Sequence, residues 1–107
     1  MNKELFVLHA GVCKTLAHPK RLEILTTLGD NEMAAGDISH KMNIPKANGS
    51  QHLALMRNAG ILVTRRAGVN IYYRVSSLKV IQACELMREV LVENHGKREK
   101  VLRIVRR

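Results

Sequence analysis

The apolar residues of the chain recur at two different spacings. In five segments they follow the 3.6-residue period of an α-helix, and in one segment they alternate with polar residues as in a β-strand. The first helical segment, residues 3–16, is apolar around most of its circumference. We therefore expect it to be buried on two sides, one of them against a partner subunit. The expected helices lie within residues 3–16, 19–28, 32–43, 46–59 and 76–94.

Residues that favour the first or last turn of a helix stand at most of these boundaries. Proline is accepted in a first turn, serine hydroxyls cap the N–H groups there, and glycine or asparagine commonly follows a last turn. The residues that bound the second to fifth helices in these ways are Pro19, Gly29, Asn43, Gly60 and the pair Ser76-Ser77.

The pair Asn48-Gly49 raises the question of whether this part of the chain is a turn. Asn-Gly is the strongest short-range hairpin signal when alternating apolar residues flank it. Here the residues that follow keep the helical period, with Leu53 and Met56 on successive turns. We therefore predict a helix over residues 46–59, not a turn.

Beyond this helix the period changes to two. Residues 61–75 carry isoleucine, valine, threonine and tyrosine on both sides of a centre at residues 67–70, which predicts a β-hairpin. Three arginines, Arg65, Arg66 and Arg74, lie along it. Helices, a closely spaced helix pair, a basic hairpin and a long helix in this order describe a winged helix-turn-helix, mostly α with a β-hairpin wing.

Composition favours a polyanionic partner, and by itself it does not separate DNA from RNA or anionic lipid. The chain has 107 residues, which predicts one domain, and its 3% aromatic content predicts an aliphatic core. Eighteen lysines and arginines against nine acidic residues give a net charge of +9, which favours nucleic acid through counterion release. No apolar run approaches the ~20 residues that span a bilayer, so we expect a soluble, cytoplasmic protein without a membrane partner.

The segments CKTLAHPKRLEILTTL and GDISHKMNIPKANGSQHLALMRNAGILVTRRAGVNIYYRV resemble the ArsR/SmtB repressors of bacteria and archaea. The shared features include a Leu-Ala-x-Pro-x-Arg-Leu-x-Ile-Leu signature, a Ser-x-His-Leu element and a Gly-x-x-x-Tyr-Tyr wing, and the resemblance covers residues 5–93. It implies a homodimer built on the first and last long helices. Such a dimer binds a palindromic operator and releases it when an inducer binds.

The resemblance also implies which residues meet DNA. The exposed N-terminal part of residues 46–59 would be the recognition helix in the major groove, and the hairpin would mostly contact phosphates. The alternative for the arginines is a solvated charged surface, and His52 is expected to pack rather than to read a base. The expected DNA-contacting residues are Lys46, Ala47, Asn48, Ser50 and Gln51 on the helix and Arg65, Arg66, Asn70 and Arg74 on the wing.

Gly49 stands where members of this family usually have a bulkier residue that packs inward. A glycine inside a helix costs about 1 kcal/mol relative to alanine. We therefore predict that the recognition helix begins with a soft first turn, and that this turn tightens when DNA is bound.

The metal sites of the best-known family members are missing from this sequence. At the cysteine positions of the third-helix site the chain has Ala34 and Gly36, so the thiolates that suit a soft metal are absent. The four ligand positions of the last-helix zinc site hold Ser77, Lys79, Val90 and Glu93, of which only the glutamate could ligate. We expect neither a metal nor a cofactor.

Two cysteines, Cys13 and Cys84, are the remaining candidates for sensing an inducer. They lie in the first and last helices, which the resemblance brings together at the dimer interface. One interpretation is a thiol switch there, by a disulfide, a polysulfide bridge or capture of a soft ion. The other is core packing, because free cysteine is often buried and both residues lie on apolar stripes.

Residues 1–95 are thus predicted to form a winged helix-turn-helix domain for DNA binding and dimerisation, and residues 96–107 a basic C-terminal extension. The predicted function is a homodimeric transcriptional repressor, bound to double-stranded operator DNA and released by a small-molecule, redox or soft-ion inducer. The alternative is a winged-helix module that organises nucleic acid or binds protein without an inducer. No phosphate-binding loop, GxSxG, HExxH or paired-carboxylate motif indicates an enzyme.

Overall fold

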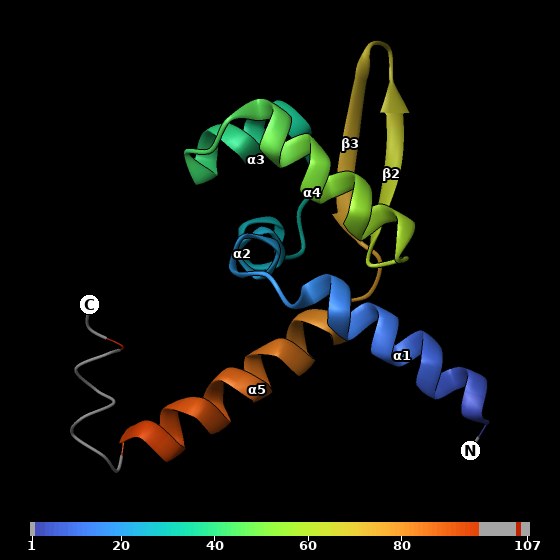
Figure 1. Ribbon diagram of the computed structural model, residues 1–107. Helices are drawn as coiled ribbons and strands as arrows, with labels where there is room; N and C mark the ends of the chain where they lie inside the picture. The colour runs from blue at the N-terminus through green and yellow to red at the C-terminus, as the bar shows by residue number, and fades with distance from the viewer. Residues whose placement is uncertain (1, 97–104, 106–107) are drawn as a thin grey trace.

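The computed structural model describes residues 2–96 and residue 105 of the chain (Figure 1). Most of the predicted extension, residues 97–104 and 106–107, lies outside the described residues. Within the described residues no helix is both long and apolar enough to cross a bilayer. The helices are α1 (Lys3–Leu16), α2 (Pro19–Leu28), α3 (Ala35–Met42), α4 (Lys46–Asn58) and α5 (Leu78–Gly96), and the strands are β1 (Met33–Ala34), β2 (Leu62–Ala67) and β3 (Asn70–Val75).

The elements are arranged as a central group with two long helices on one side of it. Figure 1 shows α2, α3 and α4 packed together, with the β2–β3 hairpin beside α4. Helices α1 and α5 lie at the opposite end of the molecule from the hairpin tip (Figure 1). The predicted helix pair is α3 and α4, and the predicted wing is the β2–β3 hairpin, so the winged helix-turn-helix fold is confirmed.

The sheet contains a strand that the sequence did not predict. Its order is β1-β3-β2, and β1 pairs antiparallel with Tyr72-Tyr73 of β3. The expectation of a helix within residues 32–43 is therefore wrong at its start, and α3 begins only at Ala35. A strand of two residues shows no measurable period, and its hydrogen-bond partners lie far along the chain, so no local pattern reveals it.

Of the two serines predicted to cap the last helix, one does so. The Ser77 hydroxyl accepts a hydrogen bond from the backbone N–H of Lys79 at 3.2 Å. The Ser76 hydroxyl instead donates to the Gly60 carbonyl at 2.8 Å, which ties the end of α4 to the segment that leads into α5. Helix α4 ends where predicted, because Gly60 has a φ of +77°, a conformation that favours glycine.

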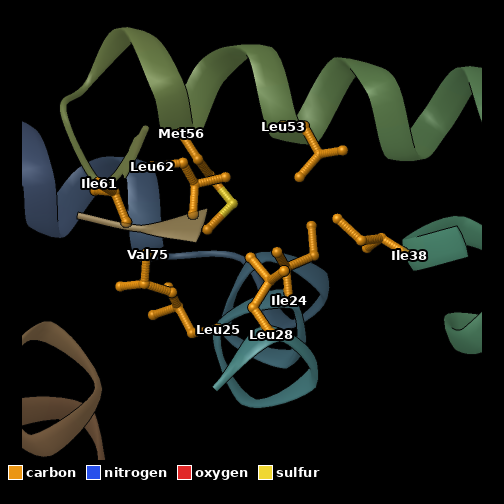
Figure 2. Close-up of a cluster of buried hydrophobic side chains, with 9 residues drawn as sticks. All are labelled: Ile24, Leu25, Leu28, Ile38, Leu53, Met56, Ile61, Leu62 and Val75. Carbon is orange, nitrogen blue, oxygen red and sulfur yellow. The ribbon is translucent and has the colours of Figure 1, made fainter. Parts of the chain in front are cut away.

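The core lies between α2, α3, α4 and the base of the hairpin (Figure 2). It is wholly aliphatic apart from one methionine, as the composition predicted. Leu53 and Met56 reach from α4 towards the side chains of α2, and Ile38 reaches in from α3 (Figure 2). This packing fixes which face of α4 points outward. The buried apolar residues are Ile24, Leu25, Leu28, Ile38, Leu53, Met56, Ile61, Leu62 and Val75.

Helices α1 and α5 leave most of their apolar side chains exposed. None of the residues Lys3–Leu16 is buried, and Phe6 and Val7 are 55% and 71% exposed. On α5, Leu86 is 61% exposed. Val12 of α1 does pack against the core. Of the two sides of the first helix that were predicted to be buried, only the one that faces the core is covered within a single chain.

Candidate nucleic-acid interface

Helix α4 has a buried stripe and an exposed polar face. Gly49, Leu53 and Met56 recur every three or four residues and are all buried. Their spacing places them on one side of the helix, against the core. The five residues predicted to meet DNA on this helix are all exposed in its first two turns: Lys46, Ala47, Asn48, Ser50 and Gln51.

Gly49 lies where α4 comes closest to α3. A methyl group added to its Cα would overlap the Ser39 hydroxyl oxygen and lie 3.2 Å from the Ser39 Cβ and 3.6 Å from the Ile44 Cδ1. This contact adds a packing role that the intrinsic helix cost of glycine does not include, and the soft first turn that tightens on DNA stays a prediction. Gly49 is buried at this contact, and a Cβ there would require the Ser39 hydroxyl to move.

Ser39 has an unusual environment at this contact. It is 3% exposed, and its hydroxyl oxygen has no hydrogen-bond partner among the described residues. The Oγ therefore contributes volume rather than a bond at the point where α3 and α4 meet. Because protein interiors are close-packed, little additional volume can be accommodated next to the Ser39 side chain.

The two faces of the wing carry different arginines. In the β2–β3 register Arg65 lies opposite Tyr72 and Arg66 opposite Ile71, so these neighbouring arginines point to opposite faces of the hairpin. Arg74 shares the face of Arg65, since residues two apart along a strand lie on one face. The sequence predicted the same role for Arg65 and Arg66, but the strand register places them on different faces of the hairpin.

Arg65 is held in place by two partners. Its Nε donates to the two carboxylate oxygens of Glu32 at 3.1 and 3.2 Å, and its Nη2 also donates to Oε1. Its guanidinium carbon lies 4.9 Å from the centre of the Tyr72 ring. The hydrogen bond from Arg65, together with the charges of Arg65 and Arg74, holds the pKa of Glu32 below its usual value.

The other predicted wing residues are exposed at or near the tip. The turn consists of Gly68 and Val69, and Val69 is 95% exposed. Arg66, Asn70 and Arg74 are exposed as well. Among the described residues neither Arg66 nor Arg74 forms an ion pair, so their charges face solvent.

His52 points away from this exposed surface. It is half-buried, its Nδ1 accepts a hydrogen bond from Arg21 Nε at 3.2 Å, and its ring lies 4.6 Å from the ring of His18. The expectation that His52 packs is confirmed. The sequence did not single out Arg21, and its only local signal is its place in the Leu-Ala-x-Pro-x-Arg-Leu signature.

The two cysteines line one cavity between α1 and α5. The cavity has a volume of about 500 Å³, and Val12, Leu16 and Met87 are among its walls. Both thiols are free; Cys84 is half-buried and packs against the core, whereas Cys13 is exposed. Within one chain the core-packing interpretation therefore fits Cys84 and does not fit Cys13. In the part of the chain that is described, no cluster of three His, Cys, Asp or Glu residues could hold a metal.

Known proteins are similar to this chain in sequence and architecture. The model of a helix-turn-helix domain matches residues 16–65. The chain is 39% identical over 78 residues to the biofilm growth-associated repressor of Agrobacterium fabrum, which covers 73% of this chain and 67% of the relative. It is 36% identical over 74 residues to the transcriptional activator HlyU of Vibrio cholerae, covering 69% of this chain and 68% of that protein.

A solved structure is also similar to this chain. The homodimeric winged helix-turn-helix DNA-binding domain of a possible ArsR-family transcriptional regulator from Mycobacterium bovis is 30% identical and has a TM-score of 0.75. The match covers 84% of this chain and 83% of that domain. The chain therefore belongs to the ArsR family of winged helix-turn-helix proteins, and it is a DNA-binding transcriptional regulator.

Proposed function

We propose that this regulator is a cytoplasmic homodimeric repressor, which binds a palindromic operator through α4 and the wing and leaves it when an inducer binds. The observation that carries the proposal is the division of α4 into a stripe packed on the core and an exposed polar N-terminal half. A helix anchored in this way can enter the major groove with its first turns against the base edges.

We assign base reading to the polar side chains of α4. Ser50 and Gln51 can both donate and accept hydrogen bonds, and glutamine pairs best with adenine. Lys46 lies at the start of the helix, where no side chain caps the first N–H groups, so a phosphate could meet both its charge and these donors. Ala47 and Asn48 flank these residues on the same exposed surface.

We assign phosphate contacts to the wing. Arg66, Asn70 and Arg74 are exposed and can reach the backbone beside the groove that α4 occupies. Arg65 is different, because its Nε and Nη2 already donate to Glu32, whose negative charge offsets that of the guanidinium beside a phosphate. Wing contacts of this kind position the protein and add to affinity without reading sequence.

The exposed apolar sides of α1 and α5 support dimerisation. A large apolar surface on a small soluble protein commonly marks an interface, and a domain of this size gains core by pairing. A two-fold dimer would set its two recognition helices about 34 Å apart, one turn of DNA, which matches an inverted repeat. The Mycobacterium bovis relative is itself homodimeric.

Selection of DNA from a random duplex library by the purified protein tests the proposal. We expect an inverted repeat with half-sites about 10 base pairs apart, bound with a steep dependence on salt. Gln51→Ala should relax selectivity at one base pair per half-site. Gln82 is an exposed glutamine on α5, and Gln82→Ala should leave the selected sequence unchanged. If random duplex binds as tightly as the best selected sequence, the protein organises nucleic acid and is not an operator-specific repressor.

We also propose that the inducer acts through Cys13 and Cys84, which face one cavity between the dimer helices. A two-electron oxidant would convert the two thiols to a disulfide and take up the two electrons and two protons that they lose. This bond would join α1 to α5 and shift the dimer geometry.

Intact-mass measurement before and after diamide treatment tests this step alongside operator binding. We expect a loss of about 2 Da per chain and a fall in affinity, both absent in Cys13→Ser and in Cys84→Ser. No crosslink and unchanged operator binding in the wild type would remove the thiol proposal and leave the inducer to be found elsewhere.

A further inference from the structure

The Arg21 side chain joins three helices. Arg21 lies on α2, and its Nη1 donates to the backbone carbonyl of Thr15 at 2.9 Å, in the last turn of α1. Its Nε donates at 3.2 Å to Nδ1 of His52, on the recognition helix α4. Both bonds are partly buried. Because the last carbonyls of a helix have no partner within it, the Arg21 bond to Thr15 satisfies a group that α1 leaves open.

His18 completes this junction. It precedes α2, and its own Nδ1 accepts from the backbone N–H of Lys20 at 3.1 Å, which fixes the orientation of its ring. The rings of His18 and His52 lie 4.6 Å apart and are tilted by 58°. His52 is therefore held by Arg21 of α2 and by His18 just before α2, and it is linked to α1 only through Arg21.

The Arg21–His52 bond exists only when His52 is neutral. A protonated imidazole carries hydrogen on both nitrogens, so its Nδ1 could no longer accept from a guanidinium. The charged and titratable groups that act on His52 are Arg21 and His18, and the group that faces Arg21 from α1 is the neutral Thr15 carbonyl. Burial first, and then the positive charges of His18 and Arg21, keep the pKa of His52 below its usual value.

We infer that Arg21 and His52 are positioning residues, which fix the recognition helix relative to α1, and that breaking their bond weakens operator binding. The inference rests on the proposed function, since it takes α1 as part of the dimer and α4 as the helix that enters the groove. In a two-fold dimer the angle between α1 and α4 sets the separation of the two recognition helices. A lost link therefore reduces the fit to both half-sites at once.

The sign of the pH dependence separates this idea from general electrostatics. Protonating histidines adds positive charge, which by itself raises affinity for DNA as the pH falls. If the junction positions α4, the operator affinity of the wild type should instead fall as the pH drops below the ordinary histidine value of about 6.5, because the lowered pKa of His52 delays its protonation to more acidic pH. Fluorescence anisotropy with a labelled operator duplex at fixed salt measures this profile.

Three variants identify the group responsible. His52→Gln keeps an acceptor for Arg21 but does not titrate, so it should bind as the wild type at neutral pH and lose the fall in acid. His40→Gln removes an exposed histidine of α3 and should keep the wild-type profile. Arg21→Lys loses the fork that bridges α1 and α4, and we expect about tenfold weaker binding at neutral pH, the scale of one hydrogen bond to a charged group.

Circular dichroism and sedimentation of each variant at neutral pH show whether it folds and dimerises. If the affinity of the wild type rises or stays constant in acid, the inference is wrong, and this test needs no variant. It is also wrong if folded Arg21→Lys binds as tightly as the wild type, or if His52→Gln retains the fall. If the wild type selects no operator at neutral pH, the proposed function itself has failed, which is a different result.

Discussion

Two groups of helices in this protein have similar apolar sequences and opposite burial. On α4 the Leu53 side chain is fully buried, whereas on α5 the Leu86 side chain is 61% exposed. The central helices pack on one another (Figure 1), but α1 and α5 leave most of their apolar side chains exposed. A run of apolar residues therefore predicts that a surface will be covered, but it does not predict whether the same chain or a partner covers it.

This difference separates the two tasks of the molecule. The central group and the wing are packed so that α4 has a fixed position in a single chain. The outer helices complete their burial only in the proposed dimer, so substitutions in the two groups should change different quantities. Core variants should lower the stability of each subunit, and variants in the outer helices should weaken association.

Leu53→Ala should have the largest effect on stability. Removing a fully buried leucine side chain leaves a cavity and costs about 2–5 kcal/mol. Urea unfolding followed by circular dichroism measures the loss, and Leu86→Ala serves as the control, because Leu86 is exposed in the protomer. If Leu86→Ala costs as much as Leu53→Ala at high protein dilution, the contrast between the two groups does not hold.

Gly49→Ala should destabilise the protein, although alanine normally stabilises a helix relative to glycine. The added methyl group overlaps Ser39 Oγ, and overpacking of this kind costs about 1–3 kcal/mol. Thermal unfolding measures the change. The matched variant is Ser39→Ala/Gly49→Ala, which removes the overlapping oxygen and should recover much of the loss. A stabilised Gly49→Ala would show that the close contact between α3 and α4 does not restrict this position.

Phe6→Glu should weaken the dimer about tenfold or more, because it places a charge on the apolar side of α1 that the partner is proposed to cover. Sedimentation at several concentrations measures the dissociation constant. Thr26→Glu puts the same charge on an exposed position of α2 and should leave association unchanged. Equal dimerisation by Phe6→Glu and the wild type would place the interface elsewhere.

Glu32→Gln should have the smallest effect and should change only DNA binding. It weakens the hold on Arg65 and removes one negative charge beside the wing, so operator affinity and its salt dependence should both rise slightly. Because the pair is exposed, stability at neutral pH should stay close to that of the wild type. Arg66→Ala is the counterpart and should lower affinity, since Arg66 is exposed and has no described ion-pair partner.

The Glu32–Arg65 pair also predicts how the stability of the fold changes in acid. The pKa of Glu32 is lowered in the folded protein, so its contribution to stability is present above the unfolded value and is lost as the pH falls through the folded value. Glu32→Gln should lack this loss. Its unfolding curves at mildly acidic and neutral pH therefore serve as an internal check on the pair.

Much of the candidate site follows from the sequence, because the residues that face outward on α4 are set by the helical period. Once Leu53 and Met56 are taken as the inner stripe, the outward positions around Ser50 follow from geometry. The alternation of residues 61–75 likewise predicts the two strands of the wing. The placement of Arg65 and Arg66 on opposite faces also follows from this alternation.

The rest could not be obtained from local patterns. Gly49 had a known intrinsic cost, and only the position of Ser39 on a neighbouring helix shows that an alanine there would overlap it. The partners of two other residues lie far along the chain: Arg65 bonds to Glu32, 33 residues away, and Arg21 bonds to His52, 31 residues away. Such contacts depend on how the elements pack, which the spacing of single residues does not specify.

The sequence by itself determined the helices, the wing, the net positive charge and the family to which the chain belongs. These features depend on the period of apolar residues and on residues that start or stop a helix, and both act over a few positions. The tertiary structure decided the third strand, the role of Gly49, the pairing of Arg65 and the exposure of the apolar sides of α1 and α5. The physical reason is that each of these depends on surfaces meeting across the fold, where volume and hydrogen-bond partners, and not local propensity, select the arrangement.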